Sequence, residues 1–156
     1  MGVLFGITAL ALSLAIGIPL KKKLKRQSLM KKDIPNDWRK ILREEVPYLD
    51  KLSDPDRKKL WGLIHIFLDE VEFIACQDLE LTDRIRVAIA AQACLLTLKN
   101  PTQTHFDSLN TIYVYPDAFK SNIDQQQGSI VSSEESIRLG QSIRGSIVLS
   151  WNSCKQ

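Results

Sequence analysis

Few residues in this sequence have the types and spacing of a catalytic or metal-binding site. His65 and Asp69 lie four positions apart, so on a helix their side chains would share a face and could bind one metal ion. A metal site needs three or four ligands, and the same pair also fits the polar, solvated edge of a helix. The second histidine, His105, stands far along the chain, and no further residue supports it as the base for a cysteine nucleophile.

The common catalytic motifs are missing from these 156 residues. There is no His-Glu-x-x-His pair, no glycine-rich phosphate loop, no Gly-x-Ser-x-Gly elbow and no EF-hand loop. The three cysteines, Cys76, Cys94 and Cys154, are far apart and include no Cys-x-x-Cys pair. They indicate neither a disulfide framework nor a thiolate zinc site, and reduced thiols fit the cytosol. No cofactor is therefore expected in this chain.

Positive charge is concentrated near the N-terminus. Residues 1–32 hold seven of the 21 Lys and Arg and no acid, which leaves 14 basic and 18 acidic residues in the remainder. The formal net charge of +3 therefore reflects the N-terminal cluster. A nucleic-acid-binding domain needs a basic face on its folded part, so no nucleic-acid partner is expected.

The first 20 residues predict a transmembrane anchor. They carry no charged side chain, and as a helix they would be about 30 Å long, which matches the hydrocarbon core of a bilayer. Five basic residues follow and predict a membrane-flanking cluster on the cytoplasmic side: Lys21, Lys22, Lys23, Lys25 and Arg26. A cleaved signal peptide is the alternative, although its positive charge would precede the apolar run. The predicted segments are an anchor over 1–20, a basic juxtamembrane linker over 21–32 and one domain over 33–156.

Residues 79–98 predict a buried central helix that the remaining elements must pack around. From Val87 to Leu98 only Gln92 and Thr97 are polar, and a helix that is apolar all round is a buried one. A buried amide needs hydrogen-bond partners, so Gln92 is expected to be a structural polar residue of the core. Arg84 and Arg86 in the first turn predict pairing with nearby acids or solvent, or with a carboxylate elsewhere in the fold.

The flanking segments predict helices first and strands second. Helical periodicity indicates helices over residues 38–52 and over 55–76, the second capped by Asp54 with Pro55 at its first position. β-branched and aromatic residues indicate strands over 111–115 and 146–151, with a surface hairpin or loop over 121–135. The predicted fold class is α+β: a transmembrane helix, a helical region around the buried helix, and a few short strands.

Three blocks resemble the Mlc titration factor A family of glucose-regulated zinc metallopeptidases. The blocks are residues 81–96 with Ala-Ala-Gln-Ala-Cys-Leu-Leu at 90–96, residues 112–119 with Ile-Tyr-Val-Tyr-Pro-Asp-Ala-Phe, and Arg138-Leu139-Gly140 with Ile-Val-Leu-Ser-Trp at 147–151. The resemblance covers roughly residues 38–151. Asn152 and Gln141 stand where the family often has acidic residues.

The resemblance implies a zincin-like domain in which zinc is the cofactor of the full-length relatives. In that family a His-Glu-x-x-His helix and a third, acidic zinc ligand follow the strand, so the family's metal ligands match no residue here. An edge strand lines the substrate cleft in such peptidases, which makes Val148, Leu149, Ser150 and Trp151 the candidate substrate strand. The domain would then be an incomplete zincin-like domain.

These observations predict a membrane-anchored, truncated member of a zinc metallopeptidase family that is itself inactive. Whether the chain is an enzyme stays open, because the family is enzymatic and the metal motif is absent. Peptide would be a substrate only of an extended chain. The alternative is a non-enzymatic, membrane-tethered module that binds a transcription regulator or another protein.

Overall fold

The computed structural model describes residues 19–100, 106–117, 119–121, 125–127, 130–132, 136–138, 140–143 and 145–154. Residues 19–30 are helical. The helical elements that follow are α2 (Asn36–Glu45), the 3-10 helix η1 (Pro47–Lys51), α3 (Asp54–Glu70), α4 (Asp83–Thr97) and α5 (Trp151–Cys154). The strands are β1 (Glu72–Ala75), β2 (Thr111–Tyr115), β3 (Phe119–Ser121), β4 (Gln125–Gln127), β5 (Ile130–Ser132), β6 (Ser136–Arg138), β7 (Gly140–Ile143) and β8 (Ser146–Ser150).

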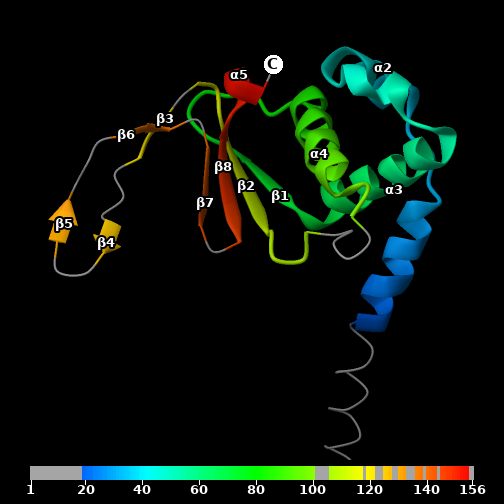
Figure 1. The fold of residues 1–156 in the computed structure, drawn as a ribbon, viewed down its shortest axis with the longest axis horizontal. Coiled ribbons are helices and arrows are strands. Elements are labelled where there is room, and N and C mark those ends of the chain that lie inside the picture. The colour runs from blue at the N-terminus through cyan, green and yellow to red at the C-terminus, as the bar shows by residue number, and fades with distance from the viewer. Residues whose placement is uncertain are drawn as a thin grey trace, which may run out of the picture.

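The central sheet has four strands in the order β1-β2-β8-β7. β1, β2 and β8 are parallel, whereas β7 pairs antiparallel with β8. Parallel neighbours need a crossover, and α4 is the helix that joins β1 to β2. Two short antiparallel pairs, β3 with β6 and β4 with β5, lie outside this sheet. Figure 1 shows them extending away from it.

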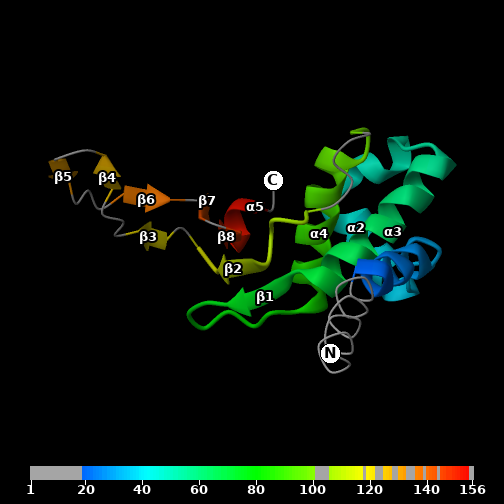
Figure 2. The same cartoon turned by 90° about the horizontal axis from the view of Figure 1, so that it is seen from below.

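Helix α4 lies between the sheet and helices α2 and α3 (Figures 1 and 2). This position explains its apolar composition, since Val87, Ala88, Ala90 and Ala91 are all at most 1% exposed. The helix is nevertheless exposed to solvent near its C-terminal end, where Leu96 is 85% exposed. The buried central helix is therefore present, but it does not exclude water on every side.

The predicted fold class is wrong in its order of elements. The helix expected over residues 55–76 ends at Glu70, and Glu72–Ala75 form strand β1 ahead of α4. The described chain thus contains a β-α-β unit rather than helices followed by strands. Short apolar runs such as Phe73-Ile74-Ala75 fit either periodicity, and parallel pairing with β2 decides this one.

The predicted transmembrane helix is corrected by the same structure. No helix within the described ranges is long and apolar enough to cross a membrane. Residues 1–18, on which most of that prediction fell, lie outside the described residues. The described residues test neither the boundaries of the predicted segments nor the cytoplasmic placement.

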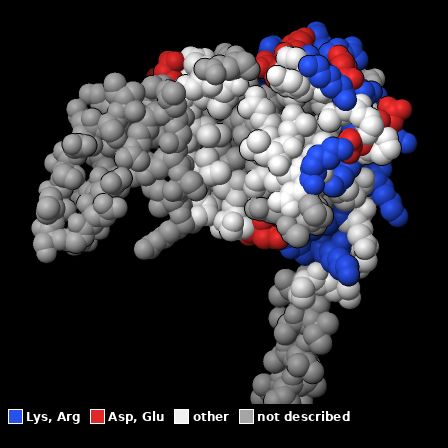
Figure 3. Space-filling view, viewed as in Figure 1, with Lys and Arg blue, Asp and Glu red and all other residues white. Residues whose placement is uncertain are grey.

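The helical segment 19–30 packs on α3. Met30 contacts Gly62, where a side chain would meet the backbone of Met30 at less than 3 Å. Figure 3 shows acidic and basic side chains gathered over this segment and the helices, whereas the surface over α4 and the sheet is mostly uncharged. Opposite charges therefore meet where the segment joins the domain.

Basic residues of the segment pair with acids of the domain. Arg26 donates from both Nε and Nη2 to the Glu70 carboxylate at 2.6 Å, and it also contacts Asp107. Lys22 lies 3.4 Å from Glu70, and Lys25 lies 2.7 Å from Asp69. These predicted membrane-flanking residues thus contact the protein itself, and their role at a membrane stays untested.

This ion-pair cluster predicts a pH-dependent stability. Hydrogen bonding to Arg26, with its positive charge, lowers the pKa of Glu70. A lowered pKa in the folded state means that the stabilisation is present at neutral pH and is lost as pH falls from about 4.3 through the folded-state value. We expect Glu70→Gln to lower the free energy of unfolding by roughly 1–2 kcal/mol at pH 7, because Glu70 is only partly buried.

Urea unfolding at pH 7 and at successively lower pH measures this difference. The difference in the free energy of unfolding between wild type and Glu70→Gln should become smaller as the pH decreases. Asp107→Asn is the matched control, and its effect should be smaller because the Asp107 side chain is 66% exposed. A gap that stays constant with pH would contradict the assigned role of Glu70.

Candidate functional site

The parallel strands β1, β2 and β8 end together at one edge of the sheet. Because their register is parallel, Ala75, Tyr115 and Ser150 lie at the same end. Ligand sites in open sheets with parallel strands form outside this carboxyl edge. The residues that follow the three strands are therefore the candidate functional site.

A hydrogen bond joins the ends of β1 and β2. Cys76 donates its backbone N–H to the Val114 carbonyl at 2.9 Å, which extends the ladder by one residue. The side chains of Cys76 and Tyr115 are hydrogen-bonded, and this contact, with some burial, raises the pKa of the Tyr115 phenol. At neutral pH the phenol is therefore uncharged and acts as a polar, unionised group at this edge.

Helix α5 begins where β8 ends and is held by the loop after β2. The backbone N–H of Asn152 donates to the Pro116 carbonyl at 3.1 Å, and its side-chain Nδ2 donates to Asp117 Oδ1 at 2.5 Å. Ser153 Oγ donates to Ser150 Oγ at 3.0 Å. Trp151 is 7% exposed and packs in the main core. The direction in which the chain leaves β8 is thus fixed by both side chains and backbone.

The central helix supplies a further contact to α5. Gln92 Nε2 donates to the Cys154 carbonyl at 3.1 Å. This bond joins the middle of α4 to the last described turn of the chain, and it accounts for a polar residue in an apolar run. Gln92 is partly buried, and its hydrogen-bond partner lies in helix α5, which agrees with a structural role in the core.

The bond from Gln92 predicts a change in thiol reactivity. Burial raises the pKa of Cys94 to about 12 and also raises the pKa of the half-buried Cys154. Gln92→Ala should loosen α5 and increase labelling of Cys154 by a thiol reagent at pH 8 several-fold, because the thiolate is the reactive form.

Cys94 serves as the internal control for this measurement. Its labelling in the native protein should stay slow in both forms, since it lies in the core at 2% exposure. Peptide mapping after timed alkylation separates the two thiols. Equal acceleration at Cys94 and Cys154 would indicate general unfolding and would count against a local role for Gln92.

The arrangement of polar groups does not fit a metal ion in the described residues. No group of three His, Cys, Asp or Glu within them could hold one. His65 is buried at 6%, and its Nε2 donates to the Asp33 carbonyl at 3.0 Å, while Asp69 pairs with Lys25. His65 and Asp69 therefore do not form a pair of metal ligands. His65 also does not belong to a solvated edge of the helix, because it is buried. His105 lies outside the described residues.

Comparison with known proteins shows the family of the chain. The family model described as "Glucose-regulated metallo-peptidase M90" matches residues 20–156. The chain belongs to this metallopeptidase family. The match includes the helical segment 19–30 from its second residue onward, as well as the sheet and α5.

Individual relatives agree with the M90 assignment. An uncharacterized protein of Synechocystis sp. is 36% identical over 157 residues, which is 92% of this chain and 56% of that protein. Mlc titration factor A of Klebsiella pneumoniae is 29% identical over 116 residues, and that of Yersinia pestis is 28% identical over the same length. These matches cover 73% of this chain and 43% and 42% of the relatives. The chain spans about half the length of the relatives it matches.

The family resemblance makes residues 148–151 the candidate substrate strand, and in the structure these residues belong to two different elements. Val148, Leu149 and Ser150 belong to β8, whereas Trp151 begins α5. β8 is bonded on both sides, by β2 and by β7, so it is an inner strand, and β7 is the edge strand on its side of the sheet. The role of residues 148–151 in binding substrate stays a prediction.

The structure decides between the two alternatives that the sequence left open for Arg84, namely pairing with nearby acids or solvent and pairing with a carboxylate elsewhere in the fold. Arg84 binds Glu44 at 3.2 Å and Glu45 at 2.5–2.6 Å, so it holds carboxylates of α2 rather than acids of its own turn. The hydrogen bond from Asn152 of α5 to Asp117, by contrast, could not be predicted from the sequence, because it depends on the register of β2 against β8.

Proposed function

We propose that this chain forms the scaffold half of a zinc-dependent peptidase domain. The supporting observation is the M90 match over residues 20–156 together with the fixed exit of β8. In the family that this chain resembles, the metal-binding helix follows that strand. Asp117 and Gln92 would act as positioning residues, because they hold α5 at the carboxyl edge of the sheet.

The proposed activity of the complete domain is peptide hydrolysis with zinc. The M90 family is one of metallo-peptidases, and the resemblance to the Mlc titration factor A family implies that the metal is zinc. Because the sequence of 156 residues contains no His-Glu-x-x-His motif, we propose that these residues alone neither bind zinc nor hydrolyse peptides. Their part would be to build the wall of the cleft.

The cleft wall in this proposal is the β7–β8 end of the sheet. A peptide can bind to a sheet by adding a strand to an edge, and β7 occupies this edge in the described sheet. Strand β7 would then separate residues 148–150 of β8 from the bound peptide, and Trp151 would support the turn into α5. This refines the strand expected from the sequence.

A chimera tests the proposal. The part of the Synechocystis relative beyond the matched region is joined after Gln156, and zinc content and hydrolysis of a peptide mixture are measured beside the 156-residue chain. The chimera should bind one equivalent of zinc and hydrolyse peptide, and a chelator should abolish this activity. A folded chimera without zinc or activity would overturn the assignment.

A second candidate is a non-enzymatic protein-binding module. The name of the Klebsiella and Yersinia relatives states that they titrate Mlc, which supports a protein partner for this chain, such as a transcription regulator. Calorimetric titration of purified Mlc into the 156-residue chain tests it. Saturable binding would support this candidate, and no heat of binding at high micromolar concentrations would contradict it.

A further inference from the structure

A pocket of about 130 Å³ lies between α2, η1 and α3, on elements that the proposed peptidase role does not use. Its floor is apolar: Leu42, Val46 and Leu49 are buried, and Trp61 forms one wall. An engineered apolar cavity of similar size, roughly 150 Å³, binds benzene. The pocket can therefore hold an apolar group about as large as one aromatic ring.

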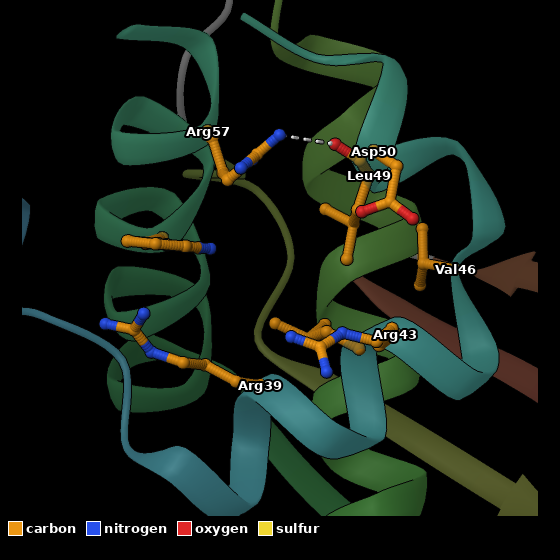
Figure 4. A pocket seen from close by; sticks show the side chains of 8 residues that line it. Arg39, Arg43, Val46, Leu49, Asp50 and Arg57 are labelled. Atoms are coloured by element: carbon orange, nitrogen blue, oxygen red, sulfur yellow. Dashed lines mark hydrogen bonds between the residues drawn. The ribbon is translucent and has the colours of Figure 1, made fainter. Parts of the chain in front are cut away.

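Three guanidinium groups line this apolar floor, and Figure 4 shows them coming from two elements. Arg39 and Arg43 belong to α2, and Arg57 belongs to α3. The acid that lines the pocket with them is Asp50, which is exposed. Positive charge therefore exceeds negative charge among the lining residues.

The three arginines differ in how far they are already paired. Arg39 donates to both oxygens of Asp33 at 2.7–2.8 Å, and its guanidinium lies 4.7 Å from the centre of the Trp61 ring. Its charge is largely balanced. Arg43, on the same helix, makes no hydrogen bond or ion pair with the described residues.

Arg57 is held in place but is incompletely satisfied. Its Nη2 donates to the carbonyls of Leu49 at 3.4 Å and Leu52 at 3.2 Å, and the first of these bonds is drawn in Figure 4. Its Nε is buried and has no hydrogen-bond partner in the part of the chain that the structure describes. Its Nη1 lies 3.8 Å from Oδ1 of the exposed Asp54, so the charge of Arg57 is only partly balanced.

We propose that this pocket binds an organic carboxylate with a small apolar body. The body would fill the space above Leu42, Val46 and Leu49, and Arg43 would bind the carboxylate, while Arg57 adds positive charge at the other end of the pocket. Guanidinium groups match a carboxylate through paired hydrogen bonds, and the apolar floor disfavours an inorganic anion such as phosphate. The free acid of a small metabolite and the C-terminal residue of a peptide share this chemistry.

Benzoate is the probe for the shared chemistry. Titration into the isotope-labelled chain, followed by the backbone and arginine Nε–H signals, should give saturable shifts confined to α2, η1 and the first two turns of α3, through Trp61. Benzyl alcohol, which has the same ring without the charge, should bind at least tenfold more weakly. Non-saturating shifts, or equal binding of the two compounds, would overturn the proposal.

Arg43→Gln provides the decisive variant, because Arg43 has no described contact whose loss would unfold the chain. Losing a charged hydrogen bond should weaken benzoate binding about tenfold or more. Arg86→Gln is the matched control, since Arg86 is an exposed helical arginine outside the pocket lining, and its affinity should be unchanged. Equal affinity of wild type and Arg43→Gln would overturn the proposal.

Two short peptides ending in phenylalanine, one with a free carboxylate and one amidated, distinguish the sources. If the free-acid peptide binds more tightly than benzoate and the amide does not bind, the ligand is a peptide C-terminus. If benzoate binds and neither peptide does, the ligand is a free small acid. Binding of the amide as tightly as the acid would contradict carboxylate recognition.

Discussion

We expect Gly62→Ala to destabilise the full chain, although the same change stabilises an ordinary helix. Replacing a glycine inside an exposed helix by alanine contributes about 1 kcal/mol of stability. At Gly62 the added Cβ would lie 2.8 Å from the Met30 Cα and 2.9 Å from its carbonyl oxygen. These are backbone atoms that cannot rotate away, so segment 19–30 must shift and weaken the Arg26–Glu70 pairing.

The expected overpacking cost is about 1–3 kcal/mol, which exceeds the gain in helix propensity. Urea unfolding of wild type and Gly62→Ala measures the net effect, and trypsin cleavage at the lysines of residues 21–32 should become faster in the variant. Loss of protection there would localise the strain to the contact between the helical segment and α3.

A chain that begins at residue 33 is the matched background. Without Met30 the clash is removed, so Gly62→Ala should raise the free energy of unfolding by up to about 1 kcal/mol. The sign of the effect should therefore reverse between the two backgrounds. The same sign and size in both would show that segment 19–30 does not pack on α3 as described.

Truncation of Ile112 should have the largest effect on stability in the sheet. Ile112 is 1% exposed on β2, and it pairs with Phe73 of β1 and Ile147 of β8. Ile112→Ala removes buried methyl groups and leaves a cavity, which costs about 2–5 kcal/mol. Because β2 also aligns β8, the bond from Asn152 to Asp117 should weaken as well.

Leu96→Ala is the control of similar size, and thermal and urea unfolding of both variants give the comparison. Leu96 is 85% exposed on α4, so its truncation should change the free energy of unfolding by less than about 0.5 kcal/mol. A large effect at Leu96 would mean that α4 is covered there by another surface. A small effect at Ile112 would contradict the central place of β2 in the sheet.

The sequence predicts elements whose signal is local. β2 at 111–115 and β8 at 146–150 follow from β-branched residues, and the central helix follows from its apolar run. The hairpin of β4 and β5 lies within the polar stretch where a hairpin was one of two expectations. For these segments, residue preference and tertiary environment agree.

Features that depend on distant partners could not be predicted in this way. β1 carries the same apolar spacing as the helix before it, and only its parallel partner makes it a strand. From the sequence, His65 is expected at the polar edge of a helix. In the fold it is buried, because its ring binds the Asp33 carbonyl and packs on Trp38 with 5.2 Å between the ring centroids. The pocket likewise requires α2 and α3 to lie side by side, so its three arginines give no pattern in the sequence.

The most direct measurement for the scaffold proposal uses the purified 156-residue chain with added zinc and a mixture of peptides. We expect the chain to retain no zinc after dialysis and to show no cleavage above the level of a heat-denatured sample. Cleavage that a chelator abolishes and zinc restores would contradict the proposal, because a metal centre would then have to be built from these residues alone.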